Sequence, residues 1–171
     1  MTHDQNEAFS LGDLVVVMNH ARIEQQGTPE DILLRPATAF VAGFVQGNNV
    51  FRGRTGEVLA DAFAIETAVG TFLAPRPRGA SPIPPGSEVS FSVRAEQITD
   101  QLSDRHLNRL TATCKAVEYF GSVRRHVLER SDGEVLKYDQ FGAQTARIAP
   151  GQRVTLGWAI EATVLHRSSG G

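Results

Sequence analysis

The sequence has a single cysteine, Cys114, among its 171 residues. One cysteine excludes an internal disulfide and any zinc site built from several thiolates. Cys114 stands between Thr113 and Lys115 in a run typical of a strand, which favours a structural thiol over a nucleophile. Long apolar runs are missing too, since no stretch approaches the ~18 residues of a membrane-spanning helix. The opening residues lack the features of a signal peptide, so we expect a cytoplasmic protein.

A strong charge of either sign is also absent. The chain has 17 Lys and Arg against 19 Asp and Glu, a formal net charge of −2. This balance argues against a protein that binds nucleic acid by neutralising phosphates. No metal site is expected, because the candidate ligands lack the ordered spacing of known metal loops (Asp100, Asp104, His106 and Glu118).

No GxxxxGK[ST] loop is present to cradle the phosphates of a nucleotide. What the sequence does have is 41% hydrophobic and 21% charged residues, which is typical of a folded globular domain. The chain is long enough to bury a core without disulfides or a metal.

The first 45 or so residues combine helix and strand signals. Residues 4–10 permit a helix, residues 14–18 predict a buried strand, and residues 22–26 predict a returning strand. Thr28 is a favourable N-cap for a helix that starts at Pro29 and ends before Pro36. A second helix over 38–45 would place four apolar side chains on one face: Phe40, Val41, Phe44 and Val45.

From Gly47 onward, strand patterns dominate. We expect strands at 49–55, 62–67, 70–74, 87–94, 110–120, 122–130, 134–138, 153–158 and 162–166. Residues 75–86 are rich in proline and predict a surface loop. Many short strands indicate a mainly β fold, a small barrel or sandwich. Five aromatic residues are predicted to lie in its core: Phe72, Phe91, Phe120, Phe141 and Trp158.

The N-terminal quarter carries a family resemblance. Its order is Thr2-His3-Asp4-Gln5, an apolar strand, Gln26-Gly27-Thr28-Pro29, a helix ended by Arg35-Pro36, and residues 40–44. This order resembles the end of the nucleotide-binding domain of ATP-binding-cassette (ABC) importers. In that family, Thr2-His3-Asp4-Gln5 corresponds to the switch-histidine loop.

The rest of the chain resembles the accessory module of the maltose, sulfate, iron and polyamine import ATPases, the transport-associated OB-like (TOBE) domain. Residues 92–98 are similar to the family's Arg-Pro-Glu stretch, with Ala95 where proline is usual. Residues 117–122 are similar to its aromatic–apolar–Gly stretch. The resemblance implies a nucleotide-binding remnant over 1–46 and an OB-like β-barrel over 47–171.

The resemblance also implies a function. The chain would be the C-terminal regulatory and dimerisation part of an importer ATP-binding subunit, with Met1 an internal start. His3 would contact the γ-phosphate in the intact subunit, which binds ATP and Mg; we expect neither in this chain alone, and no ATPase activity. Expected partners are a second copy, the transporter's membrane subunits and a small-molecule or protein regulator, but no nucleic acid. The subunit would lie on the inner face of the membrane.

Several readings of the residues stay open. Arg94 and Glu96 would coordinate a ligand or regulator, or simply pair with each other. The basic run from Arg124 to His126 would meet an anion or, as we prefer, line a solvated strand edge. The alternative function is a stand-alone regulatory β-barrel that binds a small ligand or a protein. A single-strand nucleic-acid binder is a remote third reading.

Overall fold

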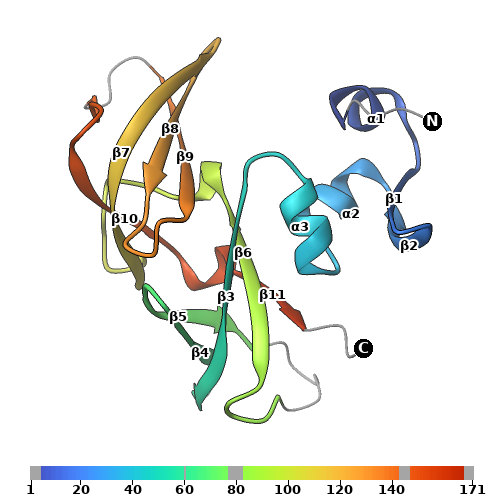
Figure 1. Ribbon diagram of the computed structural model, residues 1–171, viewed down its shortest axis with the longest axis horizontal. Coiled ribbons are helices and arrows are strands. Elements are labelled where there is room, and N and C mark those ends of the chain that lie inside the picture. The colour runs from blue at the N-terminus through green and yellow to red at the C-terminus, as the bar shows by residue number, and fades with distance from the viewer. Residues whose placement is uncertain (1–4, 60, 77–82, 143–146, 168–171) are drawn as a thin grey trace.

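The computed structural model describes residues 5–59, 61–76, 83–142 and 147–167 (Figure 1). The elements are α1 (Gln5–Leu11), β1 (Val15–Asn19), β2 (Arg22–Gly27), α2 (Pro29–Leu34), α3 (Ala39–Phe44), β3 (Asn48–Val58), β4 (Ala62–Thr67), β5 (Gly70–Pro75), β6 (Glu88–Arg94), the 3-10 turn η1 (Ala95–Gln97), β7 (Asn108–Phe120), β8 (Val123–Glu129), β9 (Val135–Phe141), β10 (Arg153–Trp158), the 3-10 turn η2 (Ile160–Ala162) and β11 (Val164–Arg167). The predicted mainly β character is confirmed, and the paired strands are antiparallel.

The N-terminal elements pack around a small core of their own. The Thr28 side chain accepts a hydrogen bond from the Asp31 N–H, and Asp31 reaches back to the Thr28 N–H, so the predicted cap of α2 is confirmed as a capping box. The core contains Val15 and Val17 of the β1–β2 hairpin with residues of α2 and α3 (Ile32, Val41 and Val45). This cluster gives short helices the tertiary support that they need.

Two predictions about this region are wrong in part. The strand β1 is not buried on both faces, because Val16 and Met18 are 44% and 54% exposed. In α3, Phe40 and Phe44 are 41% and 42% exposed, and only the Val41 side of the predicted face is buried. Both elements therefore bury one apolar side and leave another apolar side uncovered.

The remaining strands form two antiparallel sheets. One sheet has the order β11-β6-β3-β4-β5 and the other has the order β10-β7-β8-β9. The long β7 pairs with β10 through its first half and with β8 through its second half, and a β-bulge lies near Ala116. The outer end of β7 therefore extends with β8 beyond the rest of the molecule, as Figure 1 shows at the top of the view.

Between the sheets lies an aromatic core. The rings of Phe51 and Phe91 are stacked with centroids 4.7 Å apart, and those of Phe72 and Trp158 are 5.1 Å apart. Such offset pairs add to the free energy of burial. Of the five aromatics predicted to be core, Phe72, Phe91 and Trp158 are buried, and the other two are not. Phe120 and Phe141 are 56% and 55% exposed because they lie at the extended end of the β7–β9 sheet.

The described strands do not close into the single OB-like barrel that the family resemblance implies. Instead, two buried asparagines bridge the two sheets. Asn49 of β3 bonds both backbone groups of Lys137 in β9, at 2.6 and 2.9 Å. Asn108 of β7 does the same to Leu73 in β5, at 2.6 and 2.9 Å. At each junction a side-chain amide takes the place of a neighbouring strand.

Candidate functional site

The residues that the sequence singles out are only partly placed. His3 lies outside the described residues. Arg94, at the end of β6, forms an ion pair with Glu96 in η1 and donates a 3.2 Å hydrogen bond to the Leu33 carbonyl of α2. Arg94 thus ties the N-terminal elements to the larger sheet. A ligand-binding role for Arg94 and Glu96 stays a prediction.

The basic run Arg124 to His126 does not lie at a strand edge, so that prediction is wrong. Its strand, β8, lies between β7 and β9. Arg125 donates two hydrogen bonds of 2.7 Å to Asp139 on β9, and its guanidinium stands over the Phe120 ring. Hydrogen bonding to Asp139 raises the pKa of Arg125. Each of the three side chains hydrogen-bonds to a residue of β9, so the run does not form a free basic edge.

A polar cluster lies on the inner face of the same sheet. The Tyr138 hydroxyl donates a 2.8 Å hydrogen bond to Asp100, and the buried His126 ring stacks on Tyr138. Burial raises the pKa of Tyr138, and the Asp100 carboxylate raises it further. Burial also lowers the pKa of His126. Tyr138 and Asp100 border a pocket of about 360 Å³ that Glu96 also lines.

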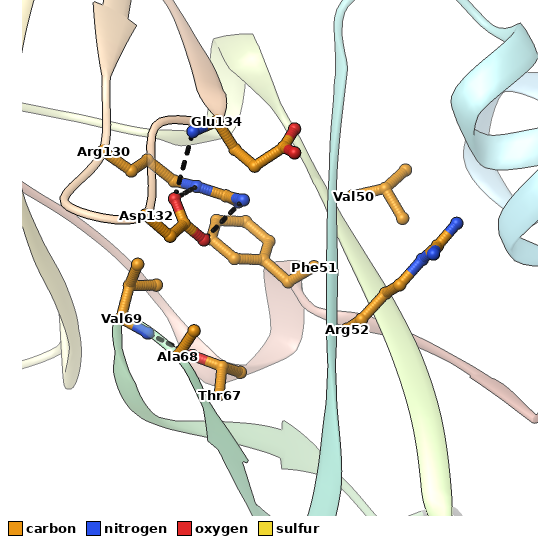
Figure 2. Close-up of a pocket in the computed structure, with 9 residues that line it drawn as sticks. All are labelled: Val50, Phe51, Arg52, Thr67, Ala68, Val69, Arg130, Asp132 and Glu134. Carbon is orange, nitrogen blue, oxygen red and sulfur yellow. Dashed lines mark hydrogen bonds and ion pairs between the residues drawn. The ribbon is translucent and has the colours of Figure 1, made fainter.

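A second pocket, of about 430 Å³, lies where the β8–β9 turn meets β3 and the β4–β5 turn (Figure 2). Arg130 is its most buried charged residue, with a side chain that is 6% exposed. The guanidinium lies 4.5 Å from the Phe51 ring centroid. Asp132 accepts two hydrogen bonds from it, of 3.1 and 3.0 Å, through Nε and Nη2. The cation is therefore fixed in one orientation by an aromatic face and a bidentate carboxylate.

The third guanidinium nitrogen of Arg130 has no such partner. Among the described residues, none accepts a hydrogen bond from its buried Nη1. A buried donor without an acceptor costs roughly 1–3 kcal/mol, more on a charged group. Glu134, on the other side of the Asp132-Gly133 turn, extends its carboxylate across the same pocket in Figure 2.

Sequence reasoning missed this pocket. The one available signal was Asp132, two residues after Arg130 in a tight turn, where Gly133 adopts a positive φ of 83°. That spacing lets the carboxylate fold back onto the guanidinium. The contribution of Phe51 and of the Thr67 turn could not be seen, because they come from distant parts of the chain.

Another buried histidine, His166, links the neighbouring strands β11 and β6. The Nε2 atom of His166, on β11, lies 2.9 Å from the Ser92 hydroxyl on β6, and both side chains are buried. Burial lowers the pKa of His166 to about 4, and the Pro36 backbone partly offsets this effect. The imidazole is therefore neutral at pH 7 and acts as a hydrogen-bonding group in the interior.

The described residues offer little for metal or membrane chemistry. Within them, no three His, Cys, Asp or Glu side chains gather in an arrangement that could hold a metal ion. None of the described helices has the length and apolar character needed to cross a bilayer. Cys114 is buried, and burial raises the pKa of its thiol, as suits a structural residue.

Comparison with known proteins identifies the C-terminal part of the fold. The sequence profile of the TOBE domain family matches residues 91–165. The chain contains a TOBE domain. The matched segment runs from the middle of β6 to β11, so it includes the whole four-stranded sheet and the Arg130 pocket's β8–β9 turn.

The match to importer subunits extends beyond the TOBE domain. The chain is 36% identical over 166 residues to the spermidine/putrescine import ATP-binding protein PotA of Acidothermus cellulolyticus, covering 94% of this chain and 43% of that protein. It is 34% identical to the uncharacterized ABC transporter ATP-binding protein YdcT of Escherichia coli, covering 96% of this chain and 42% of the relative. The chain is thus homologous to the C-terminal region of PotA-type ATP-binding subunits and spans less than half of their length.

A solved structure shares the fold. The cytoplasmic molybdate-binding protein ModG, crystallised with molybdate bound, superimposes with a TM-score of 0.62 at 18% identity. The alignment covers 72% of this chain and 98% of the ModG chain. The TOBE domain of this chain therefore has a known arrangement of strands.

Proposed function

We propose that the chain acts as the C-terminal regulatory and dimerisation part of the ATP-binding subunit of a bacterial ABC importer. The observation that carries the proposal is the 36% identity to an importer ATP-binding protein over 94% of this chain. That match includes the N-terminal elements as well as the TOBE domain. A similarity limited to the TOBE domain would not extend to the β1–β2 hairpin and the capped helix α2, which precede that domain.

In this proposal the chain has two parts. Residues 1–46 complete the nucleotide-binding domain, and residues 47–171 form the accessory TOBE domain. ATP and Mg are held by the intact subunit. There His3 donates to the γ-phosphate, where ATP hydrolysis concentrates negative charge. A second copy of the subunit and the transporter's membrane subunits are its partners, on the inner face of the cell membrane.

The test uses the gene product expressed from its own locus with a C-terminal affinity tag. We expect a tagged species well above the 18.5 kDa of this chain, copurifying with membrane-spanning subunits and hydrolysing ATP. His3→Ala should abolish or greatly reduce that activity. His20→Asn, in the exposed β1–β2 turn, is the matched control and should leave it unchanged. A species of 18.5 kDa without membrane subunits would overturn the proposal.

A second function is favoured by one observation, the shared fold with a protein described as molybdate-binding. In this reading, the chain is a stand-alone regulatory domain that binds a small ligand. Titration calorimetry of the purified chain with molybdate, sulfate and spermidine distinguishes the two. Specific binding by a monomeric chain that copurifies with no transporter subunit would favour the second function.

A further inference from the structure

The edge of β3 is open beside the Arg130 pocket. The carbonyl of Gly47, just before β3, and the N–H and carbonyl of Thr55 within it bond to residues 86–95 on the β6 side. Backbone groups alternate in direction along a strand, so the N–H and C=O of Val50 and Arg52 face the β4 side. The pairing of β3 with β4 begins only at Gly53, opposite Thr67. Among the described residues, no strand pairs with Val50 or Arg52 on that side.

The pocket covers this open edge. Its lining includes Val50 and Arg52 on one side and the turn from Thr67 to Val69 on another. Figure 2 shows the Val50 and Arg52 side chains on the opposite side of β3 from Phe51. Val50 and Arg52 therefore border the pocket with their backbone groups and not with their side chains. A volume of about 430 Å³ falls within the usual range of ligand pockets.

The charges at the pocket are complementary to a chain end. Arg130 offers the Nη1 donor that no described residue accepts from, and the Asp132 carboxylate holds it in place. Glu134 is exposed and its carboxylate reaches across the pocket (Figure 2). An anion bound to Arg130 would thus lie close to an acidic side chain. A ligand that carries a carboxylate and a nearby cation would pair its carboxylate with Arg130 and its cation with Glu134.

We propose that this pocket binds the C-terminal end of an extended peptide from a partner protein. The peptide adds as a short strand to β3 through the backbone groups of Val50 and the N–H of Arg52. Its terminal carboxylate accepts from Nη1 of Arg130, and a Lys or Arg near its end pairs with Glu134. The interaction surface is separate from Arg94 and Glu96, and the inference holds for either function proposed above.

The test measures binding of two probes by fluorescence anisotropy. One probe is a fluorophore-labelled peptide that ends in Ala-Lys-Ala with a free carboxylate, and the other is the same peptide with a C-terminal amide. We expect the free acid to bind at least about tenfold more tightly than the amide. Equal binding of the two peptides, or binding of neither, would overturn the proposal.

Two substitutions at one position separate backbone from side chain. Arg52→Pro removes the N–H that faces the pocket but leaves the β3–β6 ladder intact, because that N–H has no partner there. Arg52→Ala keeps the N–H. We expect Arg52→Pro to weaken binding of the free acid at least about tenfold more than Arg52→Ala does, and this difference isolates the backbone N–H. Wild-type affinity in folded Arg52→Pro would overturn strand addition.

The carboxylate contact is tested separately. Arg130→Gln should remove the preference for the free acid over the amide, whereas Arg54→Gln, at an exposed arginine of β3, should retain it. Circular dichroism and thermal melting establish that each variant is folded. A folded Arg130→Gln that still distinguishes acid from amide would contradict carboxylate capture.

Discussion

The side chain of Asn49 and the backbone of Lys137 form a two-way hydrogen-bonded pair between the two sheets. The Lys137 N–H donates to Oδ1 at 2.6 Å, and Nδ2 donates to the Lys137 carbonyl at 2.9 Å. Asn49 is 2% exposed. One amide side chain thus satisfies a donor and an acceptor that a neighbouring strand would otherwise satisfy.

Replacing this amide should destabilise the fold. Asn49→Leu retains the approximate volume but leaves the Lys137 N–H and carbonyl without partners, at roughly 1–3 kcal/mol for each buried group. We expect the free energy of unfolding to fall by about 3 kcal/mol in urea titrations followed by Trp158 fluorescence. Asn19→Ala, which removes a half-buried bond to Glu24, is the control. Equal losses of unfolding free energy in the two variants would show that the Asn49 bridge between the sheets does not stabilise the fold.

Local patterns were sufficient to predict most of the secondary structure. The strand expected over 87–94 is confirmed as β6, and its alternating residues Val89, Phe91 and Val93 are at most 3% exposed. Thr28 and Asp31 predicted the start of α2. These features depend on neighbours within a few residues, which is the range over which sequence periodicity is informative.

Features that depend on strand order could not be predicted in the same way. Phe120 and Phe141 look like core residues by composition, but their strands extend past the opposing sheet and leave them exposed. The Arg130 pocket joins a turn to Phe51, which lies far earlier in the chain. The bridging role of Asn49 depends on a contact across 88 residues. No local pattern contains that information.

The pair of Arg125 and Asp139 should contribute strongly to stability. The two residues face each other across β8 and β9, and their side chains are 19% and 7% exposed. Removing one partner leaves the other charge buried, which typically costs about 3 kcal/mol or more. We therefore expect Asp139→Asn to lower the urea midpoint markedly.

The control for this pair is the exposed ion pair between Lys115 and Glu129, whose side chains are 52% and 47% exposed. Glu129→Gln should cost less than about 1 kcal/mol, because water already screens the charges. If Asp139→Asn were no more destabilising than Glu129→Gln, burial would not be what makes the Arg125 pair important.

The buried His166 predicts a pH dependence of stability. Its pKa in the folded chain is about 4, against an ordinary value of 6.5. Between these values the unfolded chain binds a proton that the folded chain does not, so stability is complete above pH 6.5 and decreases as the pH falls toward 4. The shift corresponds to a loss of about 3 kcal/mol at full protonation.

The measurement compares unfolding free energies of the wild type and His166→Gln from pH 7 to pH 4. The wild type should lose more stability over this window than the variant, since the glutamine does not titrate. The lowered pKa of His126 affects both proteins equally and cancels in the difference. Parallel pH profiles, or an NMR titration of His166 near pH 6.5, would contradict the prediction.

The exposed apolar face of the β1–β2 hairpin predicts self-association. Met18 and Ile23 are register partners and are 54% and 59% exposed, with Leu14 and Val16 nearby on β1 and its approach. Contiguous apolar surface of this kind favours association in water. We expect light scattering to find a dimer at micromolar concentrations and Met18→Lys to shift it toward monomer. Leu107→Lys, at a 58% exposed residue outside the hairpin, should not. A wild type that stays monomeric would refute the association, and a dimer equally weakened by Leu107→Lys would place it elsewhere.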